Sequence, residues 1–275
     1  MQNINLSLFI PNSYLAETND LKLKTYKVGI IGRALAVFHL NKVIIYNDSS
    51  FNDQKGQKDA KFMYDVLSYM NTPQYLRKRA FPIQADLKHV GILPPLRTPH
   101  HPTNDSPKKG DYRQGFTVKR NKKGTFVDIG MDKLAFCKEQ LSVNKIFSFK
   151  ITKIAKEVIV TPEEPDDIYW GYETIYNNES LNKSLNKLNP DFVVITTRYA
   201  DTINSIFDEL RYKVNKSNNI AIVFGGPYSS VEGNFNNPNW DVIELNTIPN
   251  QGTKTVRTEE AVLSTLSLFN MLLAD

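Results

Sequence analysis

Three polar loops carry the residues of this sequence that are best placed to bind a ligand. They occupy residues 196–199, 225–227 and 246–257, and each follows a short run rich in Val and Ile that is typical of a buried strand. Ligands of open α/β sheets bind beyond the carboxyl ends of the strands. We therefore expect the three loops to converge on one pocket, with plain strand-to-helix connections as the alternative.

The loop at 246–257 is the strongest of the three candidates. It is mostly polar, contains Gly252, and leads into a helix predicted at 258–273. Glycine permits a close approach of ligand and backbone, and exposed backbone N–H and C=O groups can recognise an adenine edge. Long loops in compact domains tend to be functional, so this loop predicts a ligand site. Gly225 and Gly226 would similarly let the backbone approach a sugar or a methionine moiety.

Alternating strands and helices are predicted to position these loops. Short apolar runs bounded by polar residues predict buried strands at 6–10, 42–46, 192–195, 220–224 and 242–245. Apolar periodicity and capping residues predict helices near 23–40, 57–70, 201–214 and 258–273. Alternation of this kind indicates an α/β fold with a mainly parallel sheet.

The middle of the chain follows a different pattern, in which turn residues separate short alternating runs at 114–119, 125–129, 146–154 and 157–161. Several short strands of this kind predict a small β-barrel that resembles an OB-fold, a common module for single-stranded nucleic acid. We therefore expect a discontinuous α/β domain at 1–93 and 166–275 and an inserted barrel at 94–165. Three aromatic residues are candidates for base stacking or, by preference, for the barrel core: Tyr112, Phe116 and Phe126.

Positive charge concentrates in one segment of the predicted barrel. The chain has a net charge of +5 and a sequence isoelectric point of about 9.0, while residues 108–123 alone hold seven Lys and Arg against one Asp. A phosphate-rich partner would be attracted to such a segment. A solvated hairpin explains the same composition equally well.

Several classes of chemistry find no support in the sequence. It contains no G-x-G for a Rossmann dinucleotide site, no P-loop and no G-x-S-x-G elbow. The single cysteine, Cys137, excludes an internal disulfide and suits packing better than nucleophilic attack. His100 and His101 lack neighbouring ligands, so we expect no metal and favour a contact to RNA phosphate or a role in loop structure. No apolar run reaches the roughly 18 residues of a membrane span, and 3–10 reads as a strand rather than a signal peptide, so a cytoplasmic protein without a membrane partner fits best.

Seven stretches, which run nearly end to end, carry a family resemblance. They are KVGIIGRALAVFHLNKVIIYND (27–48), YLRKRAFPI (75–83), LKHVGILPPLRTPHHP (87–102), VIVTPEEPDDIYWGYE (158–173), ITTRYADTI (195–203), FGGPYSSV (224–231) and NTIPNQGTKTVRTEEAVLSTLSLFN (246–270). They resemble an RNA methyltransferase family of archaea and eukaryotes within the SPOUT, or α/β-knot, superfamily. The resemblance is weaker around 103–150, as expected for an inserted domain.

The resemblance implies an α/β fold whose C-terminal segment threads a trefoil knot, with an inserted OB-like barrel that binds RNA. It also implies an obligate homodimer that holds S-adenosylmethionine in a bent shape inside the knot. The three loops would then bind this cofactor through Thr196, Thr197, Arg198, Phe224, Gly225, Gly226, Pro227, Thr247, Ile248, Pro249, Asn250, Gln251, Gly252, Thr253, Thr255, Val256 and Arg257.

An N-terminal arginine often reaches the site at the dimer interface in SPOUT enzymes, and Arg33 is the position that matches here. It lies in an otherwise apolar predicted helix, where a lone arginine is costly unless it is paired or functional. A catalytic Arg33 and a structural, salt-bridged Arg33 are equally supported. The sequence shows no unambiguous general base, since Asp48, Glu232 and Glu244 are weak candidates.

The implied function is an S-adenosylmethionine-dependent RNA methyltransferase that acts on ribosomal RNA, with a uridine base nitrogen as one candidate target. Single-stranded or looped RNA is favoured because a duplex hides its base edges. Eight cations would guide it: Arg77, Lys78, Arg79, Arg97, Lys119, Arg120, Lys122 and Lys123. The missing base keeps open a non-catalytic RNA-binding or ribosome-assembly factor that retains the fold. A nucleotide-binding enzyme unrelated to methyl transfer is a third, weaker alternative.

Overall fold

The computed structural model describes residues 4–51, 53–103, 106–228, 231–235 and 240–273. The chain divides into two compact units, and each is described by itself. We call Met1–Ser68, Lys88–Pro94 and Tyr172–Asp275 the sheet unit, and Tyr69–Leu87 and Pro95–Gly171 the barrel unit.

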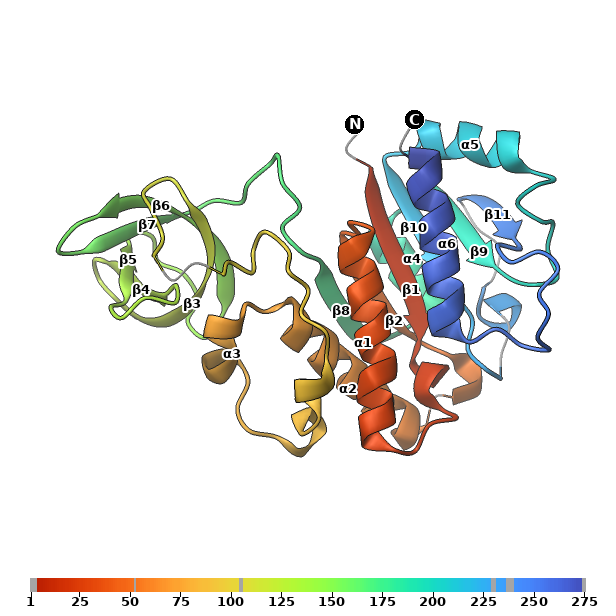
Figure 1. The fold of residues 1–275 in the computed structure, drawn as a ribbon, viewed down its shortest axis with the longest axis horizontal. Coiled ribbons are helices and arrows are strands. Elements are labelled where there is room, and N and C mark those ends of the chain that lie inside the picture. The colour runs from red at the N-terminus through yellow and green to blue at the C-terminus, as the bar shows by residue number, and fades with distance from the viewer. Residues whose placement is uncertain (1–3, 52, 104–105, 229–230, 236–239, 274–275) are drawn as a thin grey trace. The chain divides into compact units, whose positions relative to one another are not determined.

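The sheet unit is built on a six-stranded sheet with the strand order β11-β9-β10-β1-β2-β8, and every neighbouring pair is parallel (Figure 1). The expected mainly parallel α/β sheet is therefore confirmed. The sequence does not predict β8, because its residues ETIYNNES are polar and partly exposed at the sheet edge. The strands are β1 (Asn5–Pro11), β2 (Lys42–Asn47), β8 (Glu173–Ser180), β9 (Phe192–Thr196), β10 (Asn219–Val223) and β11 (Asp241–Leu245).

Helices cover both faces of this sheet. Figure 1 shows α1 and α6 side by side in front of the sheet, with α4 behind it. The helices are α1 (Leu21–Val37), α2 (Gln54–Asn71), α4 (Leu181–Leu188), α5 (Phe207–Lys216) and α6 (Thr258–Leu273). Short 3₁₀ helices lie at η1 (Asn12–Leu15), η2 (Ser49–Phe51), η4 (Val90–Ile92) and η5 (Val231–Asn234).

The limits of the helices follow local backbone chemistry. The Asp20 carboxylate accepts a hydrogen bond of 2.7 Å from the Leu23 N–H and so begins α1. His39 adopts a left-handed φ of 56°, which explains why the helix predicted to reach residue 40 ends earlier. The helix predicted at 201–214 is wrong over 201–206. Thr202 there pairs with Asn246, and that extended pairing excludes helical hydrogen bonding.

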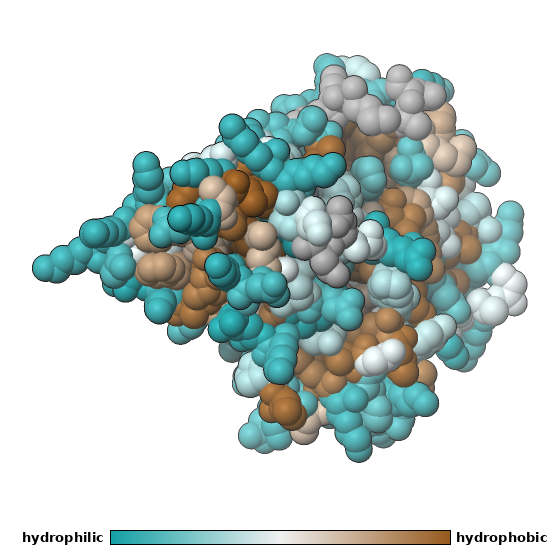
Figure 2. Space-filling model, turned by 60° about the vertical axis from the view of Figure 1, so that its left-hand side comes forward, coloured by the Kyte–Doolittle hydropathy of each residue, from teal (hydrophilic) through white to brown (hydrophobic). Residues whose placement is uncertain are grey.

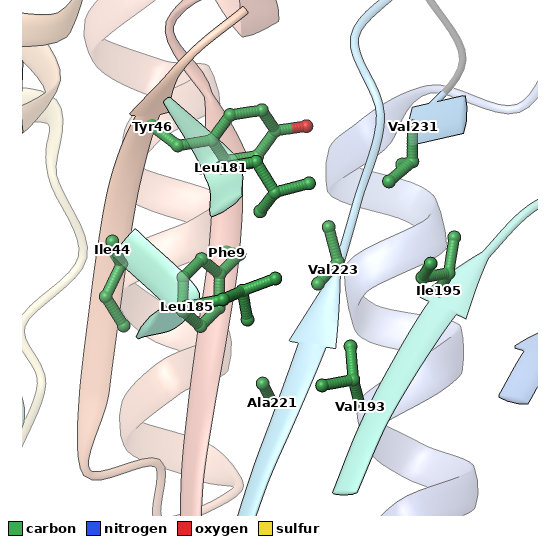
Figure 3. Packing of buried hydrophobic residues seen from close by; sticks show 10 residues of the cluster. All are labelled: Phe9, Ile44, Tyr46, Leu181, Leu185, Val193, Ile195, Ala221, Val223 and Val231. Carbon is green, nitrogen blue, oxygen red and sulfur yellow. The ribbon is translucent and has the colours of Figure 1, made fainter. Parts of the chain in front are cut away.

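One core cluster fills the space between α4 and the sheet (Figure 3). Leu181 and Leu185 of α4 pack against Phe9, Val193 and neighbouring strand residues, all of them fully buried. Tyr46 lies in the same cluster, and its hydroxyl donates a 2.7 Å hydrogen bond to the carbonyl of Phe224. This bond satisfies a buried polar group, so the bulky ring can serve as core without leaving its hydroxyl unpaired.

The barrel unit contains a closed five-stranded barrel in the order β3-β4-β5-β7-β6, as the short alternating runs predicted. Its interior holds Val127, Phe149, Ile151 and Cys137, all fully buried, which confirms packing as the role of the cysteine. The sequence does not predict β5, which is three residues long. The strands are β3 (Tyr112–Asn121), β4 (Gly124–Asp128), β5 (Ala135–Cys137), β6 (Ile146–Ile154) and β7 (Val158–Pro162).

A helix that the sequence does not predict, α3 (Gln74–Ala80), also belongs to the barrel unit. Tyr75 of α3 donates a 2.8 Å hydrogen bond to the carbonyl of Gln114 in β3, which attaches the helix to the barrel. The 3₁₀ helix η3 (Ala85–Leu87) follows it. Among the helices that the structure describes, none combines the length and apolar character of a membrane span.

Candidate functional site

The three predicted loops follow β9, β10 and β11, which are adjacent strands of the parallel sheet. Their carboxyl ends therefore lie at the same edge. Hydrogen bonds link two of the loops directly. Arg198 Nη1 donates to the carbonyl of Lys254 at 2.6 Å, and Asn246 Nδ2 donates to the carbonyl of Arg198 at 3.1 Å. The structure thus brings the loop after β9 and the loop after β11 together at this edge.

The loop at 246–257 is held by its own side chains. Asn246 Oδ1 accepts from the Ile248 N–H at 3.0 Å, and Gln251 Nε2 donates to the carbonyl of Thr253 at 2.9 Å. Asn250 adopts a left-handed φ of 58°. Gly252 is exposed, and a Cβ placed on it would meet nothing within 4 Å. The space on the Cβ side of Gly252 is therefore open.

Both ends of the same loop are also fixed. Thr247 Oγ1 lies 2.9 Å from Thr265 Oγ1 in α6, so the two hydroxyls share a hydrogen bond. The Arg257 N–H donates to Glu260 Oε2 at 2.9 Å, an interaction typical of a helix N-terminus. Pro249 and Val256 are half-buried along the loop, whereas Thr253, Thr255 and Arg257 are exposed.

The turn at 224–227 is attached to the sheet at Phe224, which is buried. Its N–H donates to the carbonyl of Phe9 at 3.0 Å, and Thr196 Oγ1 donates to the carbonyl of the preceding Val223 at 2.9 Å. Gly225 is half-buried and Pro227 is exposed. Gly226 packs against another part of the chain, because a Cβ on it would lie 2.1 Å from Ser13 Oγ. The sequence gives no signal for this close approach.

The remaining candidates for catalysis lie in different places. Arg33 is half-buried within α1 and interacts with other groups of the protein. Asp48 is fully buried just after β2, whereas Glu244 is exposed within β11. The side chain of Glu232 lies outside the described residues.

Two of the predicted RNA-binding arginines make contacts inside the barrel unit. Arg77 donates to the carbonyls of Thr72 and Met70 at 2.9 and 3.2 Å, and its guanidinium lies 4.6 Å from the centre of the Tyr69 ring. Arg79 Nε pairs with Asp128 Oδ2 at 2.7 Å. Lys78 and Arg97 are exposed.

The β3–β4 hairpin carries the remaining four predicted cations, Lys119, Arg120, Lys122 and Lys123, and all four are exposed. Arg113 of the same basic segment is instead buried: its guanidinium lies 5.4 Å from the Tyr75 ring centre, and Nη1 donates to the carbonyl of Ile129 at 3.3 Å. The positive charge available to a partner is therefore concentrated at the hairpin tip. On the face seen in Figure 2, hydrophilic side chains surround separate hydrophobic patches.

The three aromatic candidates for stacking contribute to packing in different degrees. Phe116 is buried, in agreement with the preferred core role. Phe126 is half-buried and packs edge-on against Phe136 with ring centres 5.3 Å apart. Tyr112 is half-buried, and its hydroxyl donates to Glu163 at 2.5 Å.

His100 and His101 contribute to loop structure. The Nε2 of each ring lies 2.9 Å from the carbonyl oxygen of Asn71, which can only accept, so each Nε2 carries a proton and donates. Burial lowers the pKa of His100 to about 3 and that of His101 to about 4. Both rings are therefore neutral at pH 7, which does not suit binding of a phosphate. Within the described part of the chain, no group of three or more His, Cys, Asp and Glu is arranged to hold a metal ion.

The barrel unit also has a surface hollow of about 390 Å³, lined by Gln114, Ile146, Phe147, Ser148, Pro162, Glu163 and Glu164. Ser148 Oγ donates to Glu164 at 3.0 Å and accepts from Trp170 Nε1 at 2.9 Å. Lys150 Nζ pairs with Glu163 at 2.7 Å beside it. The lining combines apolar surface with carboxylates, and the sequence patterns do not single it out.

Comparison with known proteins places these features in a family. A family model described as "Putative RNA methyltransferase" matches residues 5–269. A protein of Drosophila melanogaster named 28S rRNA (uridine-N(3))-methyltransferase is 29% identical over 95% of this chain and 61% of its own length. The human protein of the same name is 28% identical over 95% of this chain and 77% of its own length. An uncharacterised protein of Halobacterium salinarum is 28% identical over 94% of this chain and 96% of its own length.

The match covers nearly the whole chain, so the protein belongs to this family of RNA methyltransferases. The enzyme class expected from the sequence is thereby confirmed at the level of the family. The chain spans about three fifths of the fly relative and about three quarters of the human one.

Proposed function

We propose that this protein transfers the methyl group of S-adenosylmethionine (SAM) to N3 of a uridine in ribosomal RNA. The names of the fly and human relatives support the target. The observation that carries the cofactor assignment is the pair of loops that Arg198 joins at the carboxyl edge of adjacent parallel strands, since this edge is where α/β sheets bind ligands.

The residues at this edge fit the cofactor. The exposed residues Asn250 and Gly252 and the open space beside Gly252 suit a planar adenine read by backbone groups, and the turn at 224–227 lies after the neighbouring strand β10. Bound SAM would supply an electrophilic methyl group and a positively charged sulfonium. The chain's own task is to hold that methyl group in line with the accepting nitrogen.

Uridine N3 must lose its proton before or during methyl transfer. Asp48 cannot take that proton by direct contact, because it is fully buried. Arg198 and Arg257 are exposed at the loops, where either can orient an RNA phosphate or stabilise negative charge on the base. We assign Arg33 the same role from across a dimer interface.

The SPOUT fold with its trefoil knot and the homodimer are parts of the same proposal. Apolar side chains exposed on α1 and α6 support a partner subunit on this face of the sheet unit: Tyr26, Val37 and Met271 are 54%, 50% and 68% exposed. A second copy would cover them and would bring its Arg33 towards the loops. Sedimentation of the purified chain as a monomer would contradict this arrangement.

The inserted barrel at about 94–165 is the proposed RNA-binding part. The exposed hairpin cations Lys119, Arg120, Lys122 and Lys123, with Arg97, support it, because clustered Lys and Arg attract the RNA backbone; exposed Lys78 belongs to the same compact unit. Single-stranded or looped RNA is the expected form, since its base edges are accessible.

Calorimetric titration of the full chain with SAM tests the cofactor assignment, and a folded protein that binds no SAM would refute it. Mapping of methylated uridines in ribosomal RNA, from cells with and without the protein, tests the target. SAM binding without any change in methylation would instead favour a ribosome-assembly factor that retains the fold.

A further inference from the structure

Five polar residues gather just beyond β1 and β2, and we call them the Asp48 cluster: Asn12, Ser13, Asp48, Ser50 and Asn234. Asp48 stands at the centre. Its Oδ2 accepts a 2.7 Å hydrogen bond from the Ser13 hydroxyl, and its Oδ1 accepts from the Ser50 N–H and hydroxyl at 3.0 and 2.7 Å. The Asp48 N–H donates to Asn12 Oδ1 at 2.9 Å. The cluster thus joins the segments that follow two central strands.

Asn234 connects this cluster to a distant part of the chain. It ends η5, in the connection between β10 and β11. Its Nδ2 donates to Asp48 Oδ1 at 3.2 Å, and its Oδ1 accepts from the Ser49 N–H at 2.7 Å. The side-chain amide of Asn234 therefore uses its nitrogen and its oxygen to connect the β10–β11 connection to the residues just after β2.

The same connection begins with the turn at 224–227, which rests on the cluster through Gly226. A Cβ on Gly226 would lie 2.1 Å from Ser13 Oγ and 3.2 Å from Asp48 Oδ2. Just before it, the carbonyl of Phe224 accepts the Tyr46 hydroxyl at 2.7 Å. The connection is thus fixed at Phe224, at Gly226 and at Asn234.

The burial of Asp48 indicates that the Asp48 cluster fixes the segments around it. A buried carboxylate is costly unless hydrogen-bond donors surround it, and an apolar residue would fill the same space without that cost. A polar network in which every group is hydrogen-bonded selects one arrangement of the segments that it joins, because hydrogen bonds are directional. Apolar contacts do not select an arrangement in this way. Asp48 is fully buried, so it acts through the segments it holds and not by touching a ligand.

We propose that the Asp48 cluster is the positioning element of the cofactor site, which holds the 224–227 turn in its binding conformation and so sets the affinity for SAM. This inference rests on the proposed function. A turn that is already ordered loses little conformational freedom when a ligand binds, and loosening it weakens binding. The affected quantities are the SAM dissociation constant and the KM for SAM, while kcat is expected to change little.

A double-mutant cycle on the full chain tests the contact between the turn and the cluster. Gly226→Ala forces a methyl group against Ser13 Oγ, and we expect SAM binding to weaken roughly tenfold by calorimetry. Ser13→Ala removes that oxygen but also removes the hydrogen bond from Ser13 to Asp48, so the double variant Ser13→Ala/Gly226→Ala should regain only part of the affinity. The matched control is Gly91→Ala in the same unit, whose methyl group would meet nothing within 4 Å and should leave binding unchanged.

A second variant keeps the inference testable if Gly226→Ala does not fold. Asn234→Ala removes the hydrogen bonds that its amide makes to Asp48 and Ser49, and we expect SAM binding to weaken several-fold with faster hydrogen exchange at the Gly225 and Gly226 amides. Wild-type affinity and exchange in folded Asn234→Ala, or no recovery in the Ser13→Ala/Gly226→Ala double variant, would overturn the positioning role while leaving the proposed function intact. Absence of SAM binding by the wild-type chain would instead refute the proposed function and the cofactor role together.

Discussion

The two units present their candidate ligand-binding residues in contrasting ways. In the sheet unit, the loops after β9 and β11 are hydrogen-bonded to each other, and the turn after β10 packs against Ser13. In the barrel unit, Lys119, Arg120, Lys122 and Lys123 extend from a hairpin into solvent. A small ligand read by backbone groups needs fixed atoms, whereas an RNA backbone is attracted by charge with little demand on geometry. The fixed loops of the sheet unit therefore suit the proposed cofactor binding, and the exposed cations of the barrel unit suit the proposed RNA binding.

Loss of core packing should separate the two units most strongly. Phe149 in the barrel and Phe269 in α6 are both fully buried, and replacing either with Ala should cost about 3–5 kcal/mol of unfolding free energy. Phe149→Ala should leave SAM affinity near that of the wild type, whereas Phe269→Ala should reduce it. Denaturant unfolding and calorimetry measure the two effects, and an equal loss of SAM affinity in both variants would contradict the division.

The open space at Gly252 should be the most sensitive point of the proposed cofactor loops. Gly252→Trp places a large ring where nothing now lies within 4 Å of a Cβ, so we expect SAM affinity to fall by more than about a hundredfold. The melting temperature should stay close to that of the wild type, because no protein group is displaced. Normal SAM binding by this variant would show that the loop is not the pocket.

Removal of the hairpin charges should affect RNA binding and leave SAM binding unchanged. We expect the quadruple Ala variant at Lys119, Arg120, Lys122 and Lys123 to bind RNA roughly thirtyfold more weakly, and the slope of its logarithmic salt dependence to fall by about 0.7 for each phosphate that is no longer neutralised. Filter binding across a series of salt concentrations measures both. A matched control replaces four exposed lysines of the sheet unit, Lys22, Lys58, Lys183 and Lys216. Equal weakening by the control would remove the special role of the hairpin.

The buried histidines should give the barrel unit a modest sensitivity to acid. Unfolded histidines gain protons below pH 6.5, whereas folded His100 and His101 remain neutral until about pH 3 and 4. The free energy of unfolding should therefore fall between pH 7 and pH 5.5, by about 1 kcal/mol for each histidine. His101→Gln keeps an N–H donor for the Asn71 carbonyl and should lose its share of this dependence. Urea unfolding at several pH values measures this dependence. If the unfolding free energy of His101→Gln falls with pH as steeply as that of the wild type, His101 is not buried as a neutral ring.

The sequence predicts the parts of the fold in which side-chain pattern and burial agree. The buried strands of the sheet and the clear apolar face of α6 belong to this class. Polar β8 and three-residue β5 have too little pattern to be recognised. The helix predicted at 201–214 begins late because Thr202 pairs with Asn246, a contact between residues far apart in the chain.

The candidate site shows the same limit. Its loops are visible in the sequence because they follow apolar runs, but the role of Gly226 depends on Ser13, more than two hundred residues away. Arg113 is one of the seven Lys and Arg of the basic segment 108–123, which suggested a surface position, yet the structure buries it against Tyr75. Such placements follow from tertiary packing, which local sequence patterns do not encode.

Closure of the barrel has a consequence for unwanted self-association. Every described strand of the closed ring has a neighbour on both sides, so none of them is an edge strand along its whole length. The open sheet, by contrast, ends at β11 and β8. An insertion that closes into a barrel therefore enlarges the surface for recognition without adding a full-length edge strand, whereas β11 and β8 are the edge strands at which an added strand could pair.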